Sequence, residues 1–88
     1  MIIKKVKILN KMGLHARPAA QFVKIASKYK SDVYLSKNNR EINGKSIMGV
    51  MMLAAEMGSE LEIKVDGDDE QMVIDELVSL INNKFDEE

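Results

Sequence analysis

Strict alternation of apolar and charged residues over Glu60–Asp66 constrains the fold more than any other feature of this sequence. The side chains of Leu61, Ile63 and Val65 would point to one face of a β-strand, and the charged residues between them to the other. Such a strand belongs to a sheet that buries one face and leaves the other in water, as antiparallel sheets commonly do. The remaining apolar residues must therefore cover a single face of that sheet.

Other periodic patterns supply the rest of the sheet and the layer that covers it. Segments typical of strands lie at 2–9, 32–36 and 40–43, the last two joined at Asn38-Asn39. Helical patterns begin at Ala16, span 47–55, and begin again after Asp68 or Asp69. The order β-α-β-β-α-β-α predicts an α+β fold, an open-faced β-sandwich in which a four-stranded antiparallel sheet carries three helices on one face.

Length and composition exclude several classes of protein. The 88 residues allow one modest core, and we expect a single domain over 1–88. Without cysteine and with one histidine, the chain lacks disulfides and the usual zinc ligands, so we expect no metal and no cofactor. No apolar run is long enough to span a bilayer, and residues 1–7 do not form a signal peptide. We expect a cytoplasmic monomer.

Charge is divided unevenly along the chain. Residues 1–40 carry a charge of +9 and residues 41–88 a charge of −10, which together give the net charge of −1. This division either solubilises the surface or provides a basic face for an acidic partner, and the sequence leaves both interpretations open.

Three partial motifs lack the residues that their chemistry needs. Residues 44–46 end like a nucleotide-binding loop, but Asn39 occupies the position of its first glycine. Asp66, Asp68 and Glu70 begin like a calcium loop that lacks its later ligands. The element order also suits RNA-recognition domains, but their stacking aromatic residues are missing, and we expect no nucleic-acid partner.

The segment 13–19, Gly-Leu-His-Ala-Arg-Pro-Ala, places the only histidine just before the first helix. The backbone N–H groups of Ala16 and Arg17 would be free there, and the helix dipole favours an anion. The guanidinium of Arg17 is suited to phosphate oxygens. Since a helix N-terminus disfavours imidazolium, His15 should be neutral and able to attack and hold a phosphoryl group. The chain lacks a second histidine and a nucleotide-binding loop, which indicates a carrier that depends on catalysis by other proteins.

A second segment, 45–53, has Ser46 as a plausible N-cap of a short, apolar, methionine-rich helix. Its residues either belong to the core or form a docking surface with a modifiable hydroxyl at its edge. The sequence leaves this choice open.

These two segments, the length and the element order closely resemble those of the HPr family, the histidine-containing phosphocarriers of the bacterial phosphoenolpyruvate-dependent sugar phosphotransferase system. The resemblance implies that His15 accepts phosphate on Nδ1 from phosphorylated enzyme I and passes it to a sugar-specific IIA component, with help from Arg17. It implies that Ser46 is phosphorylated by HPr kinase/phosphorylase, and that the product can recruit a catabolite-repression regulator.

We expect partners to dock on a surface formed by Ala20 and Lys24 of the first helix with Ile47, Met48 and Met51 of the second.

Two points stay open: the effect of Met12 near the site, and the relay that the protein serves. Met12 stands where family members often carry a small polar residue that can reach the phosphate. The alternatives are a regulatory binding module switched at Ser46 and a nitrogen-linked phosphorelay that does not serve sugar uptake.

Overall fold

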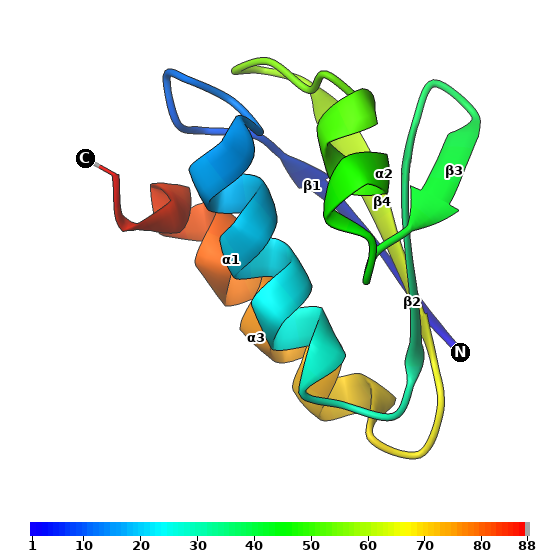
Figure 1. The fold of residues 1–88 in the computed structure, drawn as a ribbon. Coiled ribbons are helices and arrows are strands. Elements are labelled where there is room, and N and C mark those ends of the chain that lie inside the picture. The colour runs from blue at the N-terminus through cyan, green and yellow to red at the C-terminus, as the bar shows by residue number, and fades with distance from the viewer. Residues whose placement is uncertain (88) are drawn as a thin grey trace.

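The computed structural model describes residues 1–87 and has the predicted architecture (Figure 1). The elements are β1 (Ile2–Lys7), α1 (Ala16–Ser27), β2 (Asp32–Lys37), β3 (Arg40–Asn43), α2 (Ile47–Met52), β4 (Glu60–Asp66), α3 (Glu70–Asn82) and a 3-10 turn, η1 (Lys84–Asp86). All strand pairs are antiparallel, and the order across the sheet is β1-β4-β2-β3. The helices lie on one face of the sheet, which confirms the open-faced sandwich.

Strand β4 is central, and its alternation creates the core. Leu61, Ile63 and Val65 are at most 2% exposed, whereas the charged residues between them lie on the open face. The core is completed by the buried stripes of α1 (Pro18, Ala19, Phe22, Ala26) and α3 (Val73, Ile74, Leu77, Ile81). Val23 of α1 and Leu80 of α3 are partly buried and pack against this core.

Three element boundaries differ from the sequence-based expectation, and the smallest difference is at β2, which ends at Lys37 and not at Ser36. Helix α2 ends at Met52 and not at Ala55, because Ala54 adopts a left-handed conformation with φ of 50° that ends the helix. Strand β1 ends at Lys7, although the next residue still exchanges backbone hydrogen bonds with the loop before β4. The turn between β2 and β3 is confirmed, since Asn38 and Asn39 both have positive φ.

The chain after α3 folds back, which the sequence did not lead us to expect. Lys84, Phe85 and Asp86 all have positive φ, and the Phe85 side chain is 1% exposed within the core. This anchored turn carries Glu87 to the start of α1.

Pairing of β1 with β4 brings the basic and acidic parts of the chain together. Lys5 lies opposite Glu62 and Lys7 opposite Glu60 in the register of the two strands. Opposite charges at such positions are mildly stabilising. The separation of charge along the sequence is therefore partly cancelled in space.

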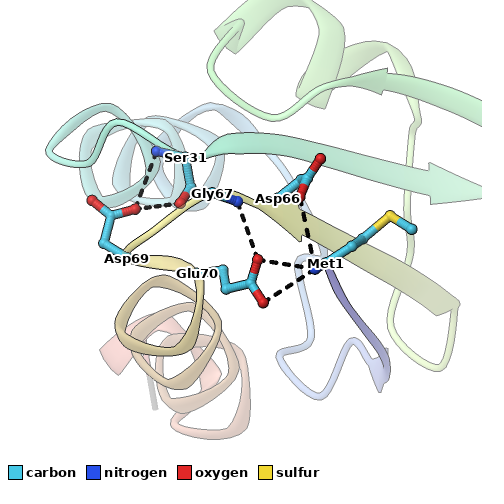
Figure 2. A network of polar contacts seen from close by, with 6 residues as sticks. All are labelled: Met1, Ser31, Asp66, Gly67, Asp69 and Glu70. Atoms are coloured by element: carbon cyan, nitrogen blue, oxygen red, sulfur yellow. Dashed lines mark hydrogen bonds and ion pairs between the residues drawn. The ribbon is translucent and has the colours of Figure 1, made fainter.

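A polar network joins the start of α3 to the start of β2 (Figure 2). Asp69 is the N-cap residue, but its carboxylate makes no capping bond. It accepts hydrogen bonds from the backbone N–H groups of Lys30 and Ser31, both at 3.1 Å, and from the Ser31 hydroxyl. Gly67 packs closely against Ser31. A β-carbon at position 67 would come within 2.7 Å of Ser31 Cα, so a larger residue would not fit there. The hydrogen bonds, above all that from the Ser31 hydroxyl, lower the pKa of Asp69 below its ordinary value of 3.8.

We expect Asp69→Asn to reduce the free energy of unfolding at neutral pH. A carboxyl whose pKa is lowered by folding stabilises the protein fully above its unfolded pKa, near 3.8 here. That contribution is lost as the pH falls through the folded pKa, so the difference between variant and wild type should shrink in acid. Urea unfolding at neutral and acidic pH measures it. Asp68→Asn, at an exposed position, is the control, and equal effects of the two substitutions would contradict the assignment.

Candidate functional site

His15 is the N-cap residue of α1, as the sequence predicted. Its backbone is extended, with φ of −75° and ψ of −172°, and its carbonyl accepts the first helical hydrogen bond from Ala19 N–H at 3.0 Å. The imidazole makes no capping bond to the helix, and its side chain is 35% exposed. A group at the tip of the helix can therefore be reached by a reactant on another protein.

The start of α1 offers hydrogen-bond donors. Within residues 1–87, the N–H groups of Ala16 and Arg17 have no acceptor, and Pro18, buried in the first turn, has no N–H to satisfy. The first turn carries no acidic residue. The Arg17 side chain is exposed and forms no ion pair with the described residues. These groups form a small electropositive surface beside the imidazole.

The loop before His15 is fixed by contacts with the segment after α2. Leu14 is buried, and its N–H donates to Ala55 O at 2.9 Å. Gly13 has φ of 69°, and a β-carbon there would lie 3.1 Å from Glu56 Cα and closer still to the Ala55 carbonyl. Only glycine fits this approach, which explains why the motif begins with it. Met12, in the same loop, is 71% exposed.

A carboxylate that sequence reasoning missed lies against the imidazole. Oε2 of Glu87 is 2.6 Å from Nε2 of His15. Its other oxygen, Oε1, accepts a hydrogen bond at 2.8 Å from Nδ2 of Asn10, a fully buried residue. The only sequence signal for this contact is Phe85, an isolated aromatic residue in a polar tail that can be buried only if the tail folds back.

Ser46 is the N-cap of α2, since its Oγ accepts a hydrogen bond from Gly49 N–H at 3.1 Å. The helix that follows buries Val50 but leaves Ile47, Met48 and Met51 exposed. Helix α2 thus contributes one residue to the core and keeps its other apolar side chains in solvent, and docking of a partner on them stays a prediction.

The residues predicted to dock partners lie on two helices that pack against each other. Helix α1 presents Ala20 and Lys24 in exposed positions, and α2 presents Ile47, Met48 and Met51. We call these five residues the helix-pair surface. In the described chain, Lys24 forms no ion pair, so this surface combines apolar side chains with an unneutralised positive charge.

The site lies outside the two hollows described on the surface. Two shallow hollows of about 270 and 350 Å³ lie elsewhere, and neither is lined by His15, Arg17 or Ser46. Residues 1–87 contain no group of three acidic, histidine or cysteine side chains that could hold a metal ion. No helix in this part of the chain could cross a bilayer, since the longest, α3, has 13 residues.

Comparison with known proteins gives consistent matches over the full length. Residues 2–83 match the family model described as the PTS HPr component phosphorylation site. The phosphocarrier protein HPr of Treponema pallidum is 48% identical over 88 residues, which cover all of both chains. A crystal structure of HPr-C-His from Thermoanaerobacter tengcongensis has a TM-score of 0.96 at 48% identity, covering 100% of this chain and 99% of the other.

A further similar protein is named for catabolite repression. The crystal structure of Crh, the Bacillus subtilis catabolite repression containing protein, has a TM-score of 0.76 at 42% identity and covers 96% of this chain and 97% of the other. Crh forms an intertwined dimer with a swapped domain in that crystal.

Proposed function

This chain belongs to the HPr family of phosphocarriers, and from that membership we propose that His15 is its phosphoryl acceptor. Nδ1 of His15 takes the group from phosphorylated enzyme I, whose own donor is phosphoenolpyruvate, and passes it to a sugar-specific IIA component. The observation that carries this proposal is the partly exposed imidazole at the tip of α1, next to two amide donors and an arginine side chain that have no partner among residues 1–87.

The site supplies stabilisation for the phosphoryl oxygens. The N–H groups of Ala16 and Arg17 point away from the helix start, where a dianion is favoured by the dipole. The guanidinium of Arg17 adds a charge-assisted contact. Met12 adds no polar contact to the phosphate. We infer that the protein acts as a covalent intermediate and not as a stand-alone enzyme, and that it needs no cofactor.

Phosphoenolpyruvate and enzyme I should attach one acid-labile phosphate to each chain, because phosphate bound to an imidazole nitrogen is lost in mild acid. We expect His15→Ala to take up none. Intact-mass measurement before and after mild acid treatment detects the label. Ser46→Ala is the matched control and should be labelled like the wild type. A His15→Ala protein that still gains the acid-labile phosphate would refute the assignment.

Partners are proposed to dock on the helix-pair surface. Exposed methionine side chains adapt to different apolar partners, and Lys24 with Arg17 can steer acidic ones. This arrangement suits a carrier, which must bind enzyme I and then a different protein, each only briefly. Chemistry and docking should therefore be separable by substitution at Arg17 and at Met48.

We expect Arg17→Ala to slow transfer at saturating carrier, and Met48→Asp to raise the KM for the carrier. A hydrogen bond to a charged group contributes about 1.5–3 kcal/mol, so the loss of the contact from Arg17 corresponds to a roughly ten- to hundredfold slower step.

The Met48 side chain would become buried when a partner docks. Burial of a methionine contributes about 1.5–3 kcal/mol, so Met48→Asp should raise KM by a similar factor. Met72→Asp, at a similarly exposed methionine on α3, is the control. If Met72→Asp raises KM as much as Met48→Asp does, the proposed surface is wrong.

Ser46 is proposed as a regulatory site. Its hydroxyl caps α2 at the edge of the helix-pair surface, immediately before Ile47 and Met48. A phosphate there would add about −1.5 to −2 charges beside these apolar side chains. We infer that HPr kinase/phosphorylase modifies Ser46, that modification weakens docking to enzyme I, and that the product can bind a catabolite-repression regulator.

Incubation with ATP and the kinase should give an acid-stable phosphate on Ser46 and slow the later labelling of His15. Phosphopeptide mapping locates the group. Ser46→Ala should remain unmodified, whereas Ser27→Ala, at an exposed serine on α1, should behave like the wild type. Acid-stable label that persists in Ser46→Ala would leave Ser46 only its capping role.

Two alternatives concern the recipient of the phosphate. A nitrogen-linked phosphorelay would use His15 without serving sugar uptake, and a purely regulatory module, a role suggested by the similarity to Crh, would use Ser46 alone. Retention of His15 beside Arg17 supports the carrier. We infer that the carrier works as a single domain over 1–88 and as a cytoplasmic monomer, without nucleic acid and without inserting into a membrane.

A further inference from the structure

Glu87 holds the imidazole of His15 from the side opposite to the proposed acceptor nitrogen. Oε2 of Glu87 lies 2.6 Å from Nε2 of His15, and Oε1 accepts a hydrogen bond from Asn10. The Glu87 side chain is only 14% exposed, although it lies near the end of the chain. Both carboxylate oxygens therefore have partners in a position largely shielded from water.

The position of Glu87 is fixed by its surroundings. Asn10 is fully buried, and its Nδ2 also donates to Gly13 O at 2.9 Å, so its two N–H groups join the loop before His15 to the tail. Phe85 anchors the tail in the core, and Glu87 N–H donates to Lys84 O at 3.0 Å. The carboxylate thus belongs to a built contact between three segments of the chain.

This contact determines which ring nitrogen carries the proton. A carboxylate can only accept hydrogen bonds, so Nε2 must be the donor. In the neutral ring the proton then lies on Nε2, and the lone pair that can attack phosphorus lies on Nδ1. We propose that Glu87 is a positioning residue for phosphoryl transfer at His15, fixing the tautomer and the orientation of the ring. The inference rests on the proposed function.

Glu87 also acts on the charge that the transfer creates. The lone pair of Nδ1 forms the new bond to phosphorus, while the bond from phosphorus to the donor atom of phosphorylated enzyme I breaks and its electron pair stays on that atom. The phosphoryl group keeps its three oxygens, and Nε2 keeps its proton. The imidazole ring consequently gains a positive charge, which the carboxylate at 2.6 Å offsets. Onward transfer reverses these changes.

Glu87→Gln tests the role with little change in size. Glutamine puts an amide nitrogen, which donates, in place of one of the two carboxylate oxygens, so it cannot keep both the contact with Nε2 of His15 and the contact with Nδ2 of Asn10 as acceptors. When its amide nitrogen faces the ring, Nε2 becomes the acceptor and the proton moves to Nδ1, which blocks attack. Asp86→Asn is the matched control, since it removes one negative charge from an exposed neighbouring position in the same tail.

Two measurements are compared for the three proteins. Long-range ¹H–¹⁵N NMR reports the tautomer without overlap, because the chain has one histidine. Rapid-quench labelling with phosphorylated enzyme I gives the rate of transfer. We expect the Nε2–H tautomer in the wild type and in Asp86→Asn, and a shift towards Nδ1–H in Glu87→Gln. Transfer to Glu87→Gln should be about tenfold slower, the lower end for loss of an orienting hydrogen bond. Melting temperatures should show that all three proteins remain folded.

The outcomes separate this inference from the proposed function. A changed tautomer together with slower transfer supports Glu87 as a positioning residue. An unchanged transfer rate, or an unchanged tautomer, overturns the inference while leaving His15 as the acceptor. A wild-type protein that takes no phosphate from enzyme I overturns the proposed function, and the NMR spectra alone then decide whether Glu87 orients the ring.

Discussion

Burial of one face of β4 is the constraint on which the rest of the structure depends. This strand pairs with β1 on one side and β2 on the other, and Leu61, Ile63 and Val65 are almost completely removed from water. At about 25 cal/mol per Å² of apolar surface, this burial is a main source of stability in so small a domain. Because only one face is buried, the helices must lie together, and their packing leaves the tip of α1 at the surface.

The proposed functional tip is assembled from parts of the chain that are far apart in sequence. The helix supplies the histidine and the free amides, and the segment after α2 holds the preceding loop through Leu14. The folded-back tail adds Glu87. An exposed histidine on a helix is mobile by itself, but one that is held by a shielded carboxylate has a defined orientation. This combination of exposure and orientation is what a carrier between proteins requires.

Most of the fold could be predicted because the patterns are local. The alternation over Glu60–Asp66 gave a strand with the observed bounds, and Asn38-Asn39 gave the turn between β2 and β3. Helix α2 was predicted three residues too long, since the apolar composition of 53–55 does not reveal that Ala54 takes a left-handed conformation. The charge of the two halves was a poor guide to the surface because β1 and β4 pair basic with acidic residues.

By itself, the sequence determined the strands and helices, the position of His15 before α1 and the capping role of Ser46, because each depends on residues within a few positions of one another. Only the tertiary structure decided that α2 exposes its methionines, and that Glu87 and Asn10 meet at the histidine. His15 and Glu87 are 72 positions apart in the sequence. They meet because burial of Phe85 turns the tail back towards α1. No local pattern encodes such a contact, since it follows from how the whole core closes.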